Sequence, residues 1–131
     1  MEVFPKNPFR ANFSQKITLR RVYEMTSIDL HPLRKESLRR EKSIEQKLAL
    51  MVRKRGGICP KWVSPGFDGV PDRIVLLPES KIAFVEVKAP GKSPRPLQIA
   101  RHKLLTRLGF KVYILDSEDQ IGGILDEIQA S

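Results

Sequence analysis

Three acid-x-lysine triplets occur in the 131-residue chain, and only the last of them ends an apolar run. The triplet at 45–47 lies in a helical pattern, where residues two apart do not share a face, and the triplet at 79–81 lies in a turn. Glu86-Val87-Lys88 instead ends the run KIAFVEV, which is typical of a β-strand. Because side chains alternate along a strand, Glu86 and Lys88 are predicted to lie on one face.

Asp72 is predicted to bring a second carboxylate to Glu86. It directly precedes the run RIVLL (73–77), which is expected to form a hairpin with strand 81–87. A three-residue turn at 78–80 would place Asp72 opposite Glu86, and directly opposed residues have Cβ atoms about 5 Å apart. A two-residue loop would break this parity, so the pairing depends on an odd loop or a bulge.

These side chains predict metal-assisted cleavage of a phosphodiester. Two close carboxylates repel each other, and a divalent cation removes that conflict. Mg²⁺ typically binds one or two carboxylates together with waters and substrate phosphate. The backbone carbonyl of Val87, between Glu86 and Lys88, is a candidate third ligand. Lys88 is a point charge that could orient the attacking water or help to deprotonate it.

The spacing of these residues resembles the PD-(D/E)xK nuclease superfamily and, within it, the virus-type replication-repair nuclease family, VRR-Nuc. The resemblance covers roughly residues 36–116. It is carried by Gly69-Val70-Pro71-Asp72, by Glu86-Val87-Lys88, and by a downstream helix with Gln98, Leu104-Leu105 and Gly109, before a strand at 111–115.

The resemblance implies DNA cleavage that depends on Mg²⁺ or Mn²⁺. Asp72 and Glu86 match the family's metal ligands, and Lys88 matches its catalytic base or water-orienting group. Glu45 matches an acid on the first helix that contacts the metal through water, and Gln98 matches a glutamine that supports the active site. The residues alone leave duller alternatives open, a solvated helix charge for Glu45 and a plain helix-surface residue for Gln98.

The predicted fold is α/β, a small mixed central sheet flanked by helices. Its α-β-β-β-α-β core is the one that the resemblance implies, restriction-endonuclease-like. A helix starting at Pro96 is expected to place Leu97, Ala100, Leu104 and Leu108 on its apolar face and to stop at Gly109. The expected elements are a helix at about 35–55, strands at 58–63, 73–77 and 81–87, the helix from Pro96, a strand at 110–115 and a last helix.

Residues 1–35 are expected to form a basic N-terminal arm that precedes a nuclease domain at 36–131. Prolines at 5, 8 and 32 interrupt the arm, and no period lasts more than a few residues. We expect it to be irregular or extended, with a short strand at 16–19 as an option, and to be available for dimer contacts.

Charge points to a polyanionic partner. The chain has 24 Lys and Arg against 15 Asp and Glu, a net charge of +9, and nucleic acid is the commonest polyanion in a cytosol. Residues 81–111 hold eight bases and one acid, Glu86. Solubility alone could explain this charge, but its position after the candidate site favours a track for the DNA backbone. The predicted track is Lys92, Arg95, Arg101, Lys103 and Arg107.

Composition excludes several classes of protein. No apolar run approaches the roughly 20 residues that span a bilayer, and the N-terminus lacks the apolar region of a secretory signal. A single cysteine, Cys59, rules out a disulfide framework and a cysteine-based zinc cluster. We therefore expect a reducing, cytosolic compartment. The expected location is the cytoplasm of a bacterial or phage-infected cell, or its nucleoid.

The sequence as a whole predicts a metal-dependent DNA endonuclease. The resemblance further implies a homodimer that is selective for branched or junction DNA in replication, recombination or repair. Two rivals stay open, a catalytically inactive nucleic-acid-binding module and an exonuclease or restriction-type enzyme of the same fold. His102 lies one turn after Gln98, and we expect a surface histidine rather than a phosphate contact.

Overall fold

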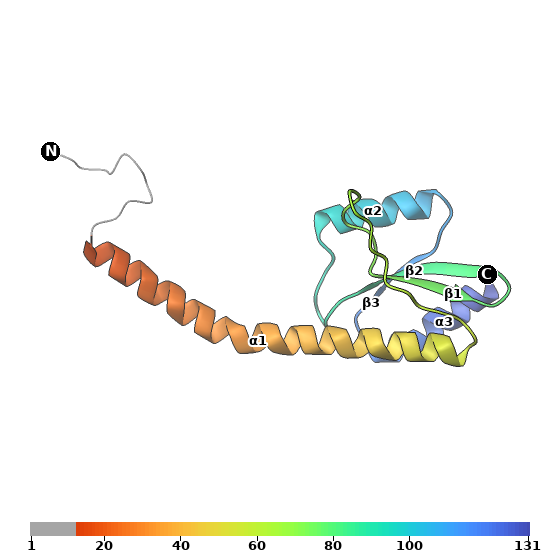
Figure 1. The fold of residues 1–131 in the computed structure, drawn as a ribbon, viewed down its shortest axis with the longest axis horizontal. Coiled ribbons are helices and arrows are strands. Elements are labelled where there is room, and N and C mark those ends of the chain that lie inside the picture. Colours follow the sequence, from red (N-terminus) through yellow and green to blue (C-terminus); the bar gives the residue numbers. More distant parts are fainter. Residues whose placement is uncertain (1–12) are drawn as a thin grey trace. The chain divides into compact units, whose positions relative to one another are not determined.

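The computed structural model describes the backbone of residues 13–131 and the side chains of residues 32–131. Contacts divide the chain into two compact units, with the boundary between Glu36 and Ser37. The elements in chain order are α1 (Phe13–Lys54), β1 (Arg73–Leu77), β2 (Lys81–Val87), α2 (Pro96–Arg107), β3 (Val112–Leu115), a 3₁₀ turn (Glu118–Gln120) and α3 (Ile121–Ala130). Figure 1 labels the helices and strands.

The prediction of an irregular arm with a strand at 16–19 is wrong for residues 13–35, which are helical and belong to α1. Residues 13–31 contain no glycine or proline, so the backbone can form a helix even though its apolar residues follow no helical period. Pro32 lies inside the helix, where proline usually costs about 3 kcal/mol. The part of the expected arm before residue 13 lies outside the described residues.

The predicted helical stretch from residue 35 to the end of α1 is confirmed, and so is its glycine stop. Gly56 adopts a positive φ of 83°, a conformation that glycine reaches without steric cost. The N–H of Gly56 donates to the carbonyl of Arg53 at 3.0 Å, and that of Gly57 donates to Val52 at 3.0 Å. This pair of bonds is the Schellman arrangement that satisfies the last carbonyls of a helix.

The sheet has three strands in the order β1-β2-β3, with β1 antiparallel and β3 parallel to β2. Leu77 pairs with Lys81 and Arg73 pairs with Val85, so the three-residue turn and the register predicted for the hairpin are confirmed. Glu79 and Ser80 both have positive φ, 67° and 61°, which tightens this turn. The mixed sheet with flanking helices confirms the predicted fold class.

The strand expected at 58–63 does not form as a regular element. The segment makes two isolated bridges to β1, Ile58 to Leu76 and Lys61 to Arg73. Pro60 explains the interruption, since it has no N–H to donate to a ladder. Its carbonyl still accepts from the N–H of Ile74 at 3.0 Å.

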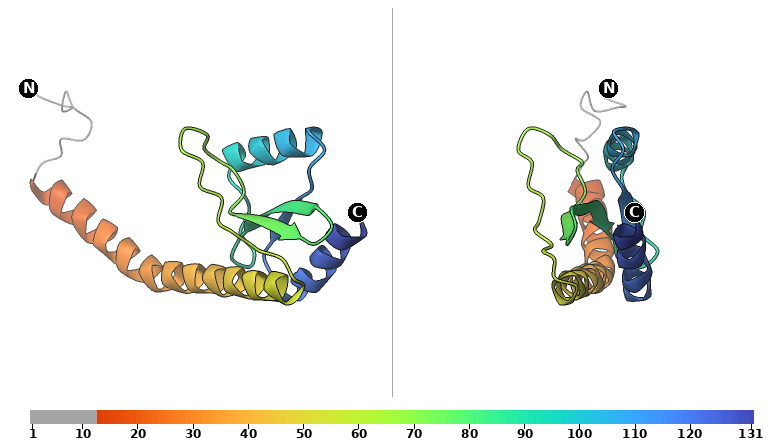
Figure 2. Two further views of the ribbon diagram at one scale, coloured as in Figure 1. Left: turned by 45° about the vertical axis from the view of Figure 1, so that its right-hand side comes forward. Right: turned by 90° about the vertical axis from the view of Figure 1, so that its right-hand side faces the viewer.

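The apolar core lies between one face of the sheet and the helices α1 and α3. From the helices it contains Ile44, Leu48 and Val52 of α1 and Ile121, Ile124, Leu125 and Ile128 of α3. From β2 it contains Ala83, Val85 and Val87, the alternate residues that a strand presents to one side. The views in Figures 1 and 2 place α2 on the opposite side of the sheet. Glu86 meets this helix through contacts with Gln98 and His102.

The predicted apolar face of α2 is wrong. Leu97 and Leu108 are 46% and 65% exposed, whereas Gln98 and His102 are buried. The reason is the partner surface, because β2 presents a carboxylate to this side and the helix meets it with side chains that can hydrogen bond.

Among the residues that the structure describes, no helix combines the length and apolarity needed to cross a bilayer.

Candidate active site

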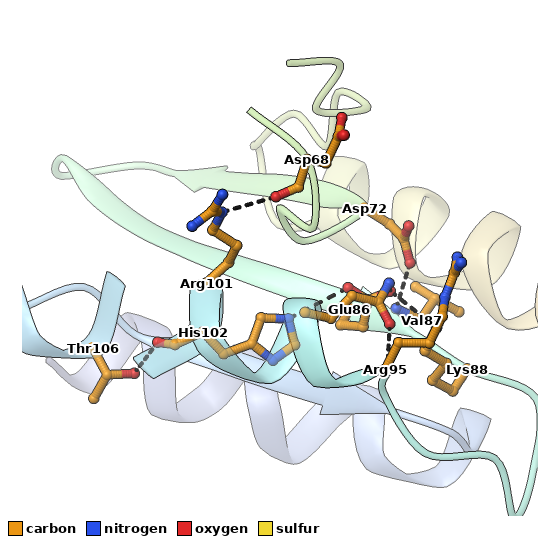
Figure 3. A network of polar contacts seen from close by, with 10 residues as sticks. Asp68, Asp72, Glu86, Val87, Lys88, Arg95, Arg101, His102 and Thr106 are labelled. Atoms are coloured by element: carbon orange, nitrogen blue, oxygen red, sulfur yellow. Dashed lines mark hydrogen bonds and ion pairs between the residues drawn. The ribbon is translucent and has the colours of Figure 1, made fainter. Parts of the chain in front are cut away.

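Two carboxylates meet at the end of the β1–β2 hairpin. Because Arg73 pairs with Val85, the register carries Asp72 to the level of Glu86. The N–H of Val87 donates to Asp72 Oδ2 at 2.9 Å, which fixes the aspartate against β2. Figure 3 shows Asp72, Glu86 and Lys88 gathered at this point. The structure therefore brings together the three residues on which the predicted site depends.

Glu86 is fully buried and is held from three directions (Figure 3). Gln98 Nε2 donates to its Oε1 at 3.1 Å, and Lys88 Nζ lies 3.5 Å from the same oxygen. His102 Nε2 lies 3.4 Å from the other oxygen, Oε2. Both carboxylate oxygens therefore have partners, as a buried polar group requires.

Burial raises the pKa of Glu86 to about 8, and the hydrogen bond and charge of Asp72 raise it in the same direction. Lys88 opposes this shift, because its ammonium favours the ionised carboxylate. Without a cation, the pair accommodates its mutual repulsion by holding a proton. A bound divalent ion would supply the positive charge that the proton otherwise provides.

We expect the stability of the metal-free protein to fall as pH rises from about 5 to 8. In this range the native state keeps the proton of Glu86 while the unfolded chain, with a pKa of 4.5, has lost it. The free energy of unfolding then decreases by at most about 1.4 kcal/mol per pH unit. Urea unfolding in EDTA at several pH values measures this, and Glu86→Gln should flatten the slope while the exposed Glu79→Gln keeps it. A free energy of unfolding that rises with pH in the wild type and in Glu79→Gln would contradict the buried environment assigned to Glu86.

Gln98 has two partners that make it more than a surface residue. Its Oε1 accepts from the N–H of Arg95 at 2.9 Å, which closes the first turn of α2, while its Nε2 holds Glu86. One side chain thus ties the start of α2 to the centre of the site. The polar contact of α2 with β2 follows from the positions of Gln98 and His102 on one side of the helix.

His102 is the site residue that sequence reasoning missed. It is buried, not on the surface as expected, and it contacts Glu86. Burial lowers the pKa of His102, and the nearby charge of Lys88 lowers it further, against an opposing effect of Asp72. Its four-residue spacing from Gln98 was a usable signal, because residues four apart lie on one helix face.

Two acids of α1 lie near this region, and they have different partners. Glu45, the acid predicted to contact metal, accepts from Arg73 Nε at 2.7 Å. Glu41 instead interacts electrostatically with Lys88 and Asp72, and the N–H of Ala89 donates to it. Burial raises the pKa of Glu41, with Lys88 opposing the shift. Glu41 thus lies in the electrostatic surroundings of Lys88 and Asp72, whereas Glu45 is paired with Arg73, and the role predicted for Glu45 stays a prediction.

The donor set fits a hard divalent ion. Among the residues that the structure describes, no three His, Cys, Asp or Glu side chains are grouped closely enough to hold a metal on their own. Mg²⁺ needs no such group, since it is usually bound by one or two carboxylates and keeps several waters. Asp72 and Glu86 would supply that pair, and the raised pKa of Glu86 reflects burial and a carboxylate repulsion that a cation would relieve.

Four of the five predicted DNA-binding residues are exposed, but the fifth is engaged in the protein. Arg101 is half-buried, and its Nε donates to the carbonyl of Asp68 at 2.8 Å. Its guanidinium also lies 4.1 Å from the centroid of the Phe67 ring. The exposed residues are Lys92, Arg95, Lys103 and Arg107.

Comparison with known proteins gives a consistent result. The family model described as VRR-NUC domain matches residues 19–119. The chain is 58% identical over 80 residues to "Putative nuclease p44" of Acyrthosiphon pisum secondary endosymbiont phage 1, which covers 61% of this chain and 86% of that protein. A solved structure described as a VRR_NUC domain superposes with a TM-score of 0.63 at 27% identity, over 66% of this chain and 95% of the other. The family model covers most of the chain, and the fold and the carboxylate pair on the hairpin agree with it. The chain therefore belongs to the VRR-NUC domain family of nucleases.

Proposed function

We propose that this chain is a divalent-metal-dependent DNA endonuclease that hydrolyses phosphodiester bonds and prefers branched or junction DNA. The observation that carries the proposal is the convergence of Asp72, Glu86 and Lys88 at one end of the hairpin. A protein that only bound DNA would gain nothing from carboxylates placed against an anionic ligand. Burying a carboxylate such as Glu86 costs folding free energy, and groups in such environments cluster at functional sites.

Asp72, Glu86 and the backbone carbonyl of Val87 would hold Mg²⁺ or Mn²⁺. When bound, the ion supplies positive charge that stabilises the transition state of phosphodiester cleavage. Gln98 and His102 keep the Glu86 carboxylate oriented, which spares the reorganisation that a mobile carboxylate would need. Lys88 orients the attacking water or accepts its proton, and its Nζ 3.5 Å from Glu86 keeps it beside the ligands.

A panel of DNA substrates tests the proposal. Flap, four-way junction, single-stranded and duplex DNA are incubated with the protein in Mg²⁺, in Mn²⁺ and in EDTA. We expect cleavage of branched DNA with either metal and no cleavage in EDTA. Binding without cleavage under every condition would favour the inactive binding module, and products released only from ends would favour an exonuclease.

The oligomeric state and cellular location extend the proposal. A 131-residue chain offers little surface for grasping a branched duplex, and a homodimer would present two cleavage sites. Sedimentation velocity showing only monomer at micromolar concentration would oppose the dimer. The phage origin of the p44 relative supports action in the cytoplasm of a phage-infected bacterial cell.

Glu41 and Glu45 provide a matched pair of variants. We expect Glu41→Gln to lower the cleavage rate about 10- to 100-fold, because it removes a charge that acts on Asp72 and Lys88. Glu45→Gln should leave cleavage nearly unchanged but cost about 1–2 kcal/mol of stability, because Arg73 loses its charged partner. Initial rates and urea unfolding measure the two effects. The reverse pattern would return the role in catalysis to Glu45.

The exposed bases after the site are proposed to bind the DNA backbone. Changing Lys92 and Arg95 together to Gln should reduce the slope of log affinity against log salt by about 2, because each phosphate contact contributes about 0.9. A double change of Arg53 and Lys54, exposed at the end of α1, serves as the control. Equal slopes for the two double variants would place the DNA elsewhere.

A further inference from the structure

A pocket of about 480 Å³ adjoins the site at Gln98, the residue that holds Glu86. It lies between the loop before β1 and the first turn of α2. Its lining combines an aromatic ring, a hydroxyl, a carboxylate, an arginine and an apolar side chain, from Phe67, Ser64, Asp68, Arg95 and Leu97. The size is within the range of small-molecule sites, about 300–1,000 Å³.

The loop wall of this pocket is preformed by its own backbone. The N–H of Phe67 donates to the carbonyl of Ser64 at 3.1 Å and closes a turn with Pro65 second and Gly66 third. Gly66 has a φ of 79°, as the third residue of a type II turn requires. The turn sets the position of Phe67 before any ligand arrives.

Gly69 and Arg101 fasten the same loop to α2. A Cβ at Gly69 would lie 2.8 Å from Leu97 Cγ, so only glycine allows this close approach. Arg101 binds the carbonyl of Asp68 and covers one face of the Phe67 ring, and Figure 3 shows the Arg101–Asp68 bond close to the Glu86 network. Phe67 nevertheless keeps 36% of its surface exposed.

We propose that this pocket holds one unpaired nucleotide of the DNA substrate, with its base on Phe67 and a phosphate at Arg95. The proposal rests on the proposed function and supplies a cause for selectivity toward branched DNA. An aromatic ring stacks with any base, whereas the base edge can hydrogen bond with Ser64 and Asp68. Arg95 provides the positive charge for a phosphate.

The pocket discriminates by pairing state because a base inside an intact duplex is stacked and paired. Removing it costs a few kcal/mol, and this cost is smallest for a nucleotide that is already unpaired. Flaps, gaps and branches that carry unpaired bases contain such nucleotides. Because Gln98 lines the pocket and bonds Glu86, a nucleotide held there would set the adjacent phosphodiester close to the carboxylate pair.

A fluorescent base tests this directly. 2-Aminopurine is placed as an unpaired base next to the branch of a flap substrate, and the matched duplex carries it paired. Binding is measured with Ca²⁺ in place of Mg²⁺, so that the readout does not require cleavage. The wild-type protein should quench the unpaired probe, because stacking on an aromatic ring quenches 2-aminopurine, and should bind the flap more tightly than the duplex.

Three variants separate stacking from other contributions. Phe67→Leu keeps apolar bulk and removes the aromatic face, so flap affinity should fall about tenfold or more with loss of quenching, while duplex affinity is unchanged. Phe67→Tyr keeps the ring and should restore both signals. Val63→Ala, at a 79% exposed position outside the pocket lining, is the control.

The outcomes keep this proposal distinct from the nuclease assignment. An equal loss of affinity for flap and duplex in Phe67→Leu, or quenching that survives in it, would overturn the pocket and leave cleavage by the wild type untouched. Flap-selective quenching that depends on Phe67, in a protein that cuts no DNA with Mg²⁺ or Mn²⁺, would support the pocket while the proposed nuclease function failed.

Discussion

Asp72→Asn should abolish DNA cleavage while DNA binding is kept or strengthened. The change removes one charge of the carboxylate pair but retains an oxygen that can accept the N–H of Val87, so the hairpin should keep its register. Loss of a metal ligand removes several kcal/mol of transition-state stabilisation, and the rate should fall roughly 10³-fold or more. Binding does not suffer, because the variant carries one negative charge fewer against an anionic ligand.

Single-turnover cleavage and equilibrium binding on the same junction DNA separate these two effects. Asp119→Asn is a suitable control, since Asp119 is exposed in the 3₁₀ turn and outside the contacts of Glu86. The pKa of Glu86 should also fall in the variant, because the Asp72 charge that raises it is gone. Cleavage by Asp72→Asn at the wild-type rate with Mg²⁺ would show that Asp72 is not an active-site residue.

The carboxylate pair was predictable from the sequence because its geometry is set by short-range rules. A hairpin has one register for each turn length, and Pro78 to Ser80 define that length through two adjacent positive φ values. Once the register is fixed, Asp72 and Glu86 share a level without any information from distant residues. The helix before Gly56 was equally local, since a glycine stop and an apolar stripe specify it.

The errors arose where a partner from elsewhere in the chain decides. For the helix acid the sequence could not choose at all, because Glu41 and Glu45 lie one turn apart on α1 and nothing within the helix decides which one lies near Lys88 and which one pairs with Arg73, so the role predicted for Glu45 stays a prediction. For α2, apolar spacing predicted burial of Leu97 and Leu108, but the surface it meets carries Glu86. The burial of His102 follows from that same contact.

Arg101 shows a third kind of limit. A basic residue after a nuclease motif is reasonably assigned to DNA, and four of its neighbours are exposed as that assignment requires. Arg101 differs because the glycine loop approaches α2 closely enough for a backbone carbonyl and an aromatic ring to reach it. This approach depends on Gly69, about 30 residues earlier in the chain, and a local sequence pattern cannot predict a contact over that separation.

Lys88→Gln should lower the cleavage rate by about 10²- to 10⁴-fold without removing metal affinity. The side chain is 14% exposed and lies 3.5 Å from Glu86 Oε1, so it is placed beside the ligands rather than in solvent. A positioned general base or acid usually contributes a factor of that size. Calorimetric titration of Lys88→Gln with Mn²⁺ should still show binding. The control is Lys47→Gln, a change of a half-exposed lysine in the acid-x-lysine triplet of α1, and this variant should cut DNA at the wild-type rate.

Lys88→Arg then distinguishes the two roles that a lysine can have here. Arginine keeps the positive charge but does not give up its proton in a protein. If the charge alone orients the water, the arginine variant should recover a substantial part of the activity lost in Lys88→Gln. If Lys88 accepts a proton, both variants should be equally slow. Loss of metal affinity in Lys88→Gln would contradict both roles, because the lysine would then act on metal binding. A wild-type cleavage rate in Lys88→Gln would also contradict both, because the lysine would then have no part in the reaction.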